Sequence, residues 1–156
     1  MSRISALGLD IGQKRIGVAG CDGTGLIATG LTTLVRTSFE QDIAALRQLV
    51  QERQVEVLVV GLPYTLQGTL GYQAKRVQKY AARLERALQL PVEYIDERLT
   101  SVEAEQLLVT QKLSPSRHKE LIDRKAAALI LQQWLDERRR NSAKNQPLEI
   151  VTSEEF

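Results

Sequence analysis

The chain has 156 residues, of which 43% are hydrophobic and 26% are charged, and its net charge at pH 7 is +2. This size and composition predict one soluble domain without a strong overall basic field, so any nucleic-acid contact must come from local clusters of cations. The single cysteine, Cys21, excludes an internal disulfide and a cysteine-based metal site, and it fits a cytoplasmic setting. Because no apolar run approaches the ~20 residues that cross a bilayer, and no signal-type apolar core opens the chain, we expect no membrane association.

Three strands are predicted at the start of the chain, at residues 4–10, 15–21 and 26–34. The first is apolar and ends in Asp10, and Gly12 permits the tight turn that follows. A second turn is predicted at residues 22–25. Connections this short allow only antiparallel pairing among the three strands.

Helices and strands then alternate. Ser38 and Gln41 form a capping-box signature for a helix from Ser38 to Arg53. A dense β-branched run at residues 55–61 is typical of a strand that is buried on both faces. A second helix is predicted from Tyr72 to Gln89, and a short strand follows at residues 92–95.

The last third of the chain is predicted to be helical. Thr100 and Glu103 indicate the start of a third helix. A basic loop is predicted at residues 112–120, and a final helix from Lys119 to Arg138. The tail, residues 139–156, is expected to be mobile, with a possible strand at residues 148–151.

This order of elements predicts an α/β fold with a mixed five-stranded sheet. Three antiparallel strands come first, alternating helices and strands follow, and helices cover both faces of the sheet. We expect residues 1–138 to form a single domain. In such sheets, functional sites gather at the carboxyl ends of adjacent strands.

Three carboxylates occupy positions that need an explanation: Asp10 at the end of a strand, Glu97 just after a strand, and Asp123 near the start of the final helix. Taken singly, each has an ordinary interpretation. Asp10 fits a turn aspartate, Glu97 a solvated or Arg98-paired acid, and Asp123 an anion stabilised by the helix dipole. However, Asp123 shares a helix face with the apolar residues Ala127, Ile130 and Trp134, and an acid pointed toward a core needs a partner.

The three acids together suggest a metal site. Two strand ends and one helix start can converge at one edge of a mixed sheet, and clustered carboxylates repel one another unless cations are present. Mg²⁺ prefers oxygen ligands, and two such ions can clamp an in-line phosphoryl displacement. The single histidine, His118, argues against a zinc site built by the protein alone.

Four motifs, in this order and spacing, resemble the bacterial YqgF family, also called RuvX, whose members are named as pre-16S rRNA nucleases and Holliday junction resolvases. The similarity runs from Gly8 to about Trp134. The motifs are Gly8-x-Asp10-x-Gly12-x-Lys14-Arg15-Ile16-Gly17-Val18-Ala19, Val59-Val60-Gly61-Leu62-Pro63, Asp96-Glu97-Arg98-Leu99-Thr100 and Asp123-x-x-Ala126-Ala127-x-x-Ile130-Leu131.

The resemblance implies an RNase H-like fold, shared with RuvC resolvases, and a metal-dependent nuclease that matures the 5′ end of 16S rRNA. Carried over by motif, Asp10, Glu97 and Asp123 would be the catalytic and metal-binding acids, holding two Mg²⁺ or Mn²⁺ ions. The sequence departs from the family at Gln67-Gly68, where an Asp-Gly pair is common. This departure weakens any metal role for that loop but removes none of the three acids.

Several cations lie near the candidate acids. Lys14, Arg15 and Arg98 are candidates for holding nucleic-acid phosphates, although solvated surface charge remains an open interpretation. The second helix carries a basic face, which we interpret as a solubility feature. Its residues are Lys75, Arg76, Lys79, Arg83 and Arg86. With four Tyr, two Phe and one Trp, the chain does not support sequence-specific reading of single strands by stacking.

Three other functions stay open at this point. A Holliday junction resolvase would act on branched DNA and would need two active sites, hence a dimer, whereas the sequence leaves the oligomeric state open. A non-catalytic factor in ribosome assembly would bind structured RNA, as pre-16S rRNA or a pre-ribosomal particle, without needing the three acids. An actin-like ATPase or sugar kinase shares the Asp-x-Gly turn but needs two such domains.

Overall fold

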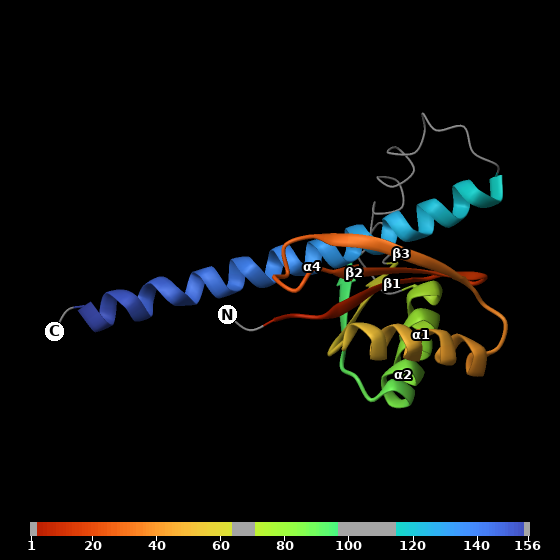
Figure 1. The fold of residues 1–156 in the computed structure, drawn as a ribbon, viewed down its shortest axis with the longest axis horizontal. Coiled ribbons are helices and arrows are strands. Elements are labelled where there is room, and N and C mark those ends of the chain that lie inside the picture. Colours follow the sequence, from red (N-terminus) through yellow and green to blue (C-terminus); the bar gives the residue numbers. More distant parts are fainter. Residues whose placement is uncertain (1–2, 64–70, 97–114, 155–156) are drawn as a thin grey trace.

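The computed structural model describes residues 3–63, 71–96 and 115–154. The helix predicted from Thr100 and the loop around Gln67 lie outside these ranges. Figure 1 shows the arrangement of the described elements. They are β1 (Ala6–Ile11), β2 (Arg15–Cys21), β3 (Ala28–Val35), α1 (Phe39–Arg53), β4 (Val57–Leu62), α2 (Tyr72–Leu88), β5 (Val92–Asp96) and α4 (Pro115–Glu154).

The five strands form one mixed sheet in the order β3-β2-β1-β4-β5. β1 pairs antiparallel with β2, and β2 pairs antiparallel with β3. β4 lies between β1 and β5 and is parallel to both. The predicted sheet is therefore confirmed, and the carboxyl ends of β1, β4 and β5 meet at one edge of it.

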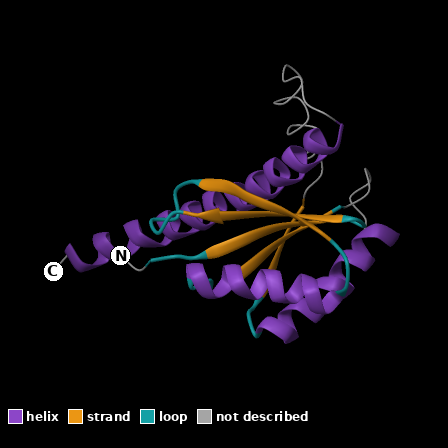
Figure 2. Ribbon diagram, turned by 45° about the vertical axis from the view of Figure 1, so that its right-hand side comes forward, coloured by secondary structure: helices purple, strands orange, loops and turns teal. Residues whose placement is uncertain are grey.

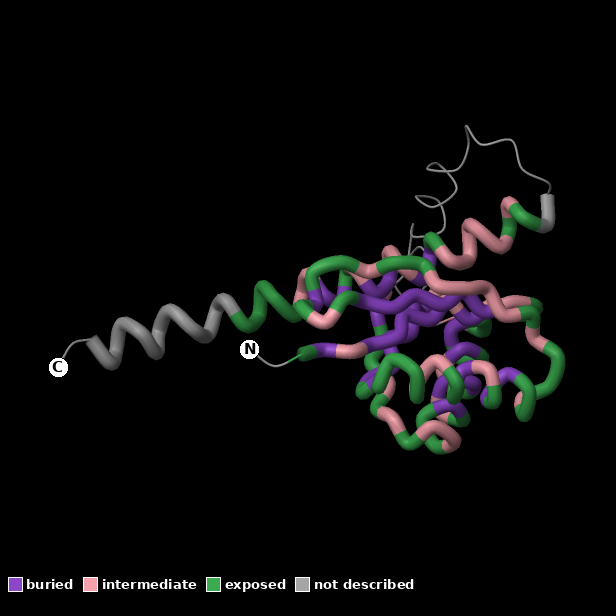
Figure 3. Tube along the Cα trace, viewed as in Figure 1, coloured by how far each residue is buried: buried purple, intermediate pink, exposed green. Residues whose placement is uncertain are grey.

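Helices cover both faces of this sheet, as predicted. α1 and α2 lie on one face and α4 crosses the other (Figure 2). Each face has its own core, and buried residues concentrate in the strands and in the helix surfaces that face them (Figure 3). The α1/α2 core includes Leu7, Leu9, Ile16, Val18, Leu58, Val60, Leu46 and Leu84. The α4 core includes Ala6, Ala19, Val59, Ile95, Ala127, Ile130, Leu131 and Trp134.

Glycines in three neighbouring strands allow α4 to lie unusually close to the sheet. A Cβ atom added to Gly17 would lie 2.0 Å from the carbonyl oxygen of Asp123, and one added to Gly8 would lie 2.8 Å from the carbonyl oxygen of Ala127. At Gly30 in β3, a Cβ would lie 3.1 Å from the Cβ of Arg124. Any larger residue at Gly17 or Gly8 would overlap the helix backbone, so these glycines set the depth at which α4 docks.

The start of α1 was predicted well, because the hydroxyl of Ser38 accepts a hydrogen bond from the backbone N–H of Gln41 at 3.2 Å. The bounds predicted for α4 were wrong. The helix begins at Pro115 instead of Lys119, and it continues to Glu154, so residues 148–151 are helical and not a strand. Proline fits the first position of a helix, and residues 119–146, which take the helix past its predicted end at Arg138, contain no glycine or proline; the helix then continues through Pro147.

The far end of α4 extends beyond the sheet (Figure 1). In the described part of the chain, no helix is both long enough and apolar enough to span a membrane.

A buried acid joins α1 to α2. Asp42 is only 5% exposed, and its Oδ2 accepts a hydrogen bond from the Tyr80 hydroxyl at 3.0 Å. Its Oδ1 accepts from the backbone N–H of Thr37 at 3.3 Å, and the Nε of Arg36 lies 3.8 Å from Oδ2. Burial, together with the negative charge of Asp42, raises the pKa of Tyr80 to about 12.

We expect Tyr80→Phe to destabilise the protein by about 1.5–3 kcal/mol at neutral pH, because Asp42 loses a hydrogen bond while it stays buried. The raised pKa also predicts a pH dependence. Between pH 10 and about 12 the unfolded chain loses the Tyr80 proton while the folded chain keeps it, so stability falls as pH rises. Urea unfolding across pH 8–12 measures both effects. The loss above pH 10 should be smaller in Tyr80→Phe than in the unsubstituted protein.

Candidate active site

Asp10 lies on the α4 side of the sheet, one residue before the end of β1. Successive side chains of a strand point to opposite faces of the sheet, so residues 6, 8 and 10 share one face. Ala6 packs in the α4 core. Leu9 and Ile11 pack in the opposite core, so Asp10 shares the α4 side with Ala6 and Gly8. Its partner in the neighbouring strand is Gly17, and the Asp10 residue is partly exposed.

Asp123, which is on α4, lies next to the same part of the sheet. Its backbone carbonyl lies directly over Gly17, the residue that pairs with Asp10. Because α4 begins at Pro115, Asp123 lies more than two turns inside the helix, where the helix dipole no longer accounts for an acid. The predicted packing of its helix face is confirmed, since Ala127 and Ile130 are fully buried against the sheet. The structure thus brings two of the three predicted acids together.

Arg15 makes an ion pair with Asp123. The Arg15 Nε donates a hydrogen bond to the Asp123 Oδ2 at 2.6 Å, and the side chains are 29% and 18% exposed. Lys14, the neighbouring candidate, is exposed on the β1–β2 turn. Arg15 therefore holds an acid of the site in this state, which is a different contact from the phosphate predicted for it.

Glu97 and Arg98, the remaining predicted site residues, lie outside the described residues. β5 ends at Asp96, which pairs with Leu62 at the end of β4. Asp96 is thus at the same edge of the sheet as Asp10, since β1 and β4 are parallel neighbours. The position of Asp96 agrees with the predicted convergence of strand ends, without testing the role of Glu97.

The donors in the described part of this site are carboxylate oxygens. Mg²⁺ and Mn²⁺ favour such ligands, so Asp10 and Asp123 fit a hard divalent ion. Among the described residues, no group of three or more His, Cys, Asp or Glu side chains could hold a metal ion. In the sequence Glu97 directly follows β5, the strand that β4 separates from β1.

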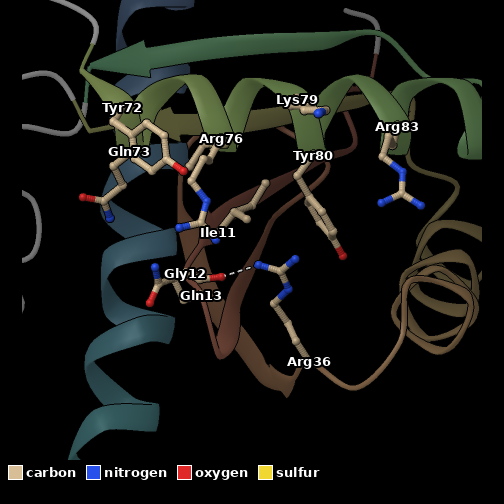
Figure 4. A pocket seen from close by; sticks show the side chains of 11 residues that line it. Ile11, Gly12, Gln13, Arg36, Tyr72, Gln73, Arg76, Lys79, Tyr80 and Arg83 are labelled. Atoms are coloured by element: carbon tan, nitrogen blue, oxygen red, sulfur yellow. Dashed lines mark hydrogen bonds between the residues drawn. The ribbon is translucent and has the colours of Figure 1, made fainter.

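The sequence did not predict a basic pocket that lies at the same edge of the sheet as Asp10, but on the face covered by α1 and α2. The pocket has a volume of about 350 Å³ and lies between α2 and the β1–β2 turn (Figure 4). Its cationic lining residues are Arg36, Arg76, Lys79 and Arg83. Three of these four belong to the basic face of α2 that was interpreted as a solubility feature. The helical spacing of the three was visible in the sequence, but the approach of Arg36 from the segment after β3 was not.

Comparison with known proteins identifies the family. RuvX, described as Holliday junction resolvase, matches residues 4–137. The chain belongs to the RuvX family. This membership confirms the resemblance seen in the four motifs.

Two named relatives are close in sequence. A protein of Trichormus variabilis named "Putative pre-16S rRNA nuclease" is 68% identical over 139 residues, which cover 89% of this chain and 92% of that protein. A protein of Crocosphaera subtropica with the same name is 68% identical, with 89% and 97% covered.

Among solved structures, Thermus thermophilus RuvC in complex with a Holliday junction substrate superposes with a TM-score of 0.56 at 15% identity. The match covers 87% of this chain and 96% of RuvC. At this identity the likeness establishes the fold, and it confirms the predicted RNase H-like class.

Proposed function

We propose that this protein is a metal-dependent nuclease that hydrolyses phosphodiester bonds in the 5′ leader of pre-16S rRNA. The observation that carries the proposal is that Asp10 and Asp123 both adjoin Gly17 near the carboxyl end of β1: Asp10 pairs with Gly17 in the sheet, and the Asp123 backbone carbonyl lies over it. RuvX membership and the names of the relatives support a nuclease, and those names also supply the rRNA substrate.

In this proposal Asp10, Glu97 and Asp123 hold two Mg²⁺ or Mn²⁺ ions. When bound, the ions supply an activated water and charge stabilisation at the leaving oxygen. The protein fixes the acids on rigid elements, β1 and α4, that are packed against one another. Arg15 orients the Asp123 carboxylate, and Lys14 and Arg98 bind substrate phosphates near the acids.

A second candidate function is cleavage of branched DNA. The description of the RuvX family and the RuvC structure with its junction substrate favour it, and it requires two active sites in a dimer. The alternative of a non-catalytic RNA-binding factor has no comparable support, because binding alone gives no reason to bring two acids together.

One experiment separates these functions. We would incubate the purified protein with labelled RNA carrying the 16S 5′ leader and with a four-way DNA junction, in Mg²⁺, Mn²⁺ or EDTA. Metal-dependent cleavage of the RNA alone supports the proposal. Symmetric cleavage of the junction by a dimer supports the resolvase, and metal-independent RNA binding without cleavage of naked RNA or of pre-ribosomal particles contradicts both.

The ion pair of Arg15 leads to a prediction about metal affinity. A divalent ion has to compete with the Arg15 guanidinium for the Oδ2 of Asp123. We therefore expect Arg15→Gln to bind Mn²⁺ several-fold more tightly, as measured by titration calorimetry on the protein without nucleic acid. Lys14→Gln removes the same charge from the adjacent position and should have a smaller effect. Equal or weaker Mn²⁺ binding by Arg15→Gln would contradict a competition for Asp123.

A further inference from the structure

The basic pocket on the α1/α2 side of the sheet has a composition that suits a nucleotide. Four cations line it, and two tyrosines, Tyr72 and Tyr80, line it with them. Figure 4 shows Arg76 and Tyr80 reaching down from α2 toward Arg36 and the β1–β2 turn. A volume of about 350 Å³ lies within the range of small-ligand pockets and fits about one nucleotide.

The positive charge of this pocket is largely uncompensated. Arg36 has a fixed position, since its Nη1 donates to the Gly12 carbonyl at 2.6 Å and its Nε lies 3.8 Å from Asp42. Arg76, Lys79 and Arg83 form no ion pair with any carboxylate in the described part of the chain. Cations gathered around one hollow repel one another, and a phosphate group relieves that repulsion.

An exposed aromatic ring lies at the same pocket. Tyr72 is 79% exposed although it opens α2, and the Arg76 guanidinium lies 5.8 Å from its ring centroid. Tyr80, by contrast, is buried, with Arg36 stacked 4.2 Å from its ring centroid. Tyr72 therefore offers a free ring face on which a base can stack, next to a cation that can bind the attached phosphate.

The pocket and the two candidate acids, Asp10 and Asp123, lie on opposite sides of one sheet edge. Asp10 and Ile11 are consecutive residues of β1, and Ile11 lines the pocket, as do Gly12 and Gln13 of the following turn. Because neighbouring residues of a strand point to opposite faces of the sheet, one nucleic-acid strand that turns around this edge can contact both the acids and the pocket.

We propose that this pocket binds one nucleotide of a single-stranded segment of the substrate, on the opposite side of the sheet edge from the bond that is cleaved. Tyr72 stacks on the base, and Arg76 and Lys79 hold its phosphates. This inference rests on the proposed nuclease function and adds to it a substrate class: structured RNA with a single-stranded extension that turns around the sheet edge.

The test compares two double variants of α2 that lose the same charge. Arg76→Gln with Lys79→Gln alters the pocket, whereas Lys75→Gln with Arg86→Gln alters exposed residues of the same helix outside it. Fluorescence anisotropy in EDTA, which prevents cleavage, would measure binding of an RNA hairpin with a single-stranded extension and of the same hairpin with a blunt end.

We expect the pocket double variant to bind the extended hairpin about tenfold more weakly, and the control variant less than about threefold more weakly. The slope of log K against log salt should fall by about 1.4 in the pocket variant, because two phosphate contacts are lost. Tyr72→Ala should weaken binding about fivefold or more without changing that slope.

Equal losses in the two double variants would overturn the proposal, because net charge alone would then explain binding. An equal loss on the blunt hairpin would overturn it too, by removing the single strand from the interaction. Tighter binding of polyglutamate than of RNA, lost in the pocket variant, would assign the pocket to an acidic protein partner instead. None of these results depends on cleavage, whereas the nuclease function fails only if the wild-type protein cleaves no substrate with Mg²⁺ or Mn²⁺.

Discussion

Asp10→Asn is expected to abolish metal-dependent cleavage, with a loss of at least about 10³-fold in rate. The substitution keeps the size of the side chain but removes the charge that binds a divalent ion. Metal ions contribute several kcal/mol to the stabilisation of a phosphoryl-transfer transition state, and each 1.36 kcal/mol is a tenfold change in rate. Initial rates on the labelled leader RNA at saturating Mg²⁺ measure the loss.

The fold should survive this change. Asp10 is partly exposed at the end of β1, and asparagine keeps the shape of its side chain. We expect the Tm without metal to change little, and the rise in Tm that Mn²⁺ causes to disappear. Asp136→Asn on α4 is the control, since that residue is 41% exposed and pairs with Arg139, so it should cleave normally. Full activity of a well-purified Asp10→Asn protein would exclude Asp10 as a metal ligand.

Gly17→Ala is expected to have the second largest effect, on both stability and activity. The new Cβ would lie 2.0 Å from the Asp123 carbonyl oxygen, and an ordinary contact of 3.4 Å requires a shift of more than 1 Å. Overpacking of this kind costs about 1–3 kcal/mol, or a decrease in Tm of about 2–12 °C for a domain of this size. A displacement of 1 Å in a catalytic group lowers the rate about a hundredfold.

Thermal unfolding and cleavage rates test this expectation together. Gly23→Ala is the matched control, because its Cβ would meet only the flexible side chain of Arg3, at 3.1 Å. Gly23→Ala should keep both its Tm and its activity. A Gly17→Ala protein with normal cleavage would show that the depth of α4 on the sheet does not control the position of Asp123.

The sheet was predictable because its signals are local. The strands are short runs rich in aliphatic and β-branched residues, and the short connections among the first three left antiparallel pairing as the one choice. The end predicted for α4 was wrong for a different reason. A polar stretch without glycine or proline can form a helix or an irregular tail, and its composition does not distinguish the two; residues 139–146 are such a stretch.

The candidate site was predictable only in part. Strand ends identify Asp10, and the apolar face of α4 identifies Asp123, but the pairing of Arg15 with Asp123 joins residues 108 positions apart. The spacing of apolar residues in the sequence does not predict a contact between side chains so far apart in the chain. The same holds for the pocket, where Arg36 meets α2 through the packing of two helices on one face of the sheet. Local patterns thus predict which elements form, and tertiary packing decides which charges meet.

The docking of α4 also has a consequence for the order in which the protein becomes competent. Asp10 leaves the ribosome early, while Asp123 is made more than 100 residues later, about 5–20 s at ordinary rates of synthesis. Until then the apolar face over Gly8 and Gly17 has no cover, and the two acids cannot meet. A nascent chain, or one truncated before residue 115, therefore cannot assemble the proposed site and leaves this apolar face of the sheet exposed. If Asp10 and Asp123 act as proposed, cleavage of RNA begins only after α4 has been synthesised and has docked.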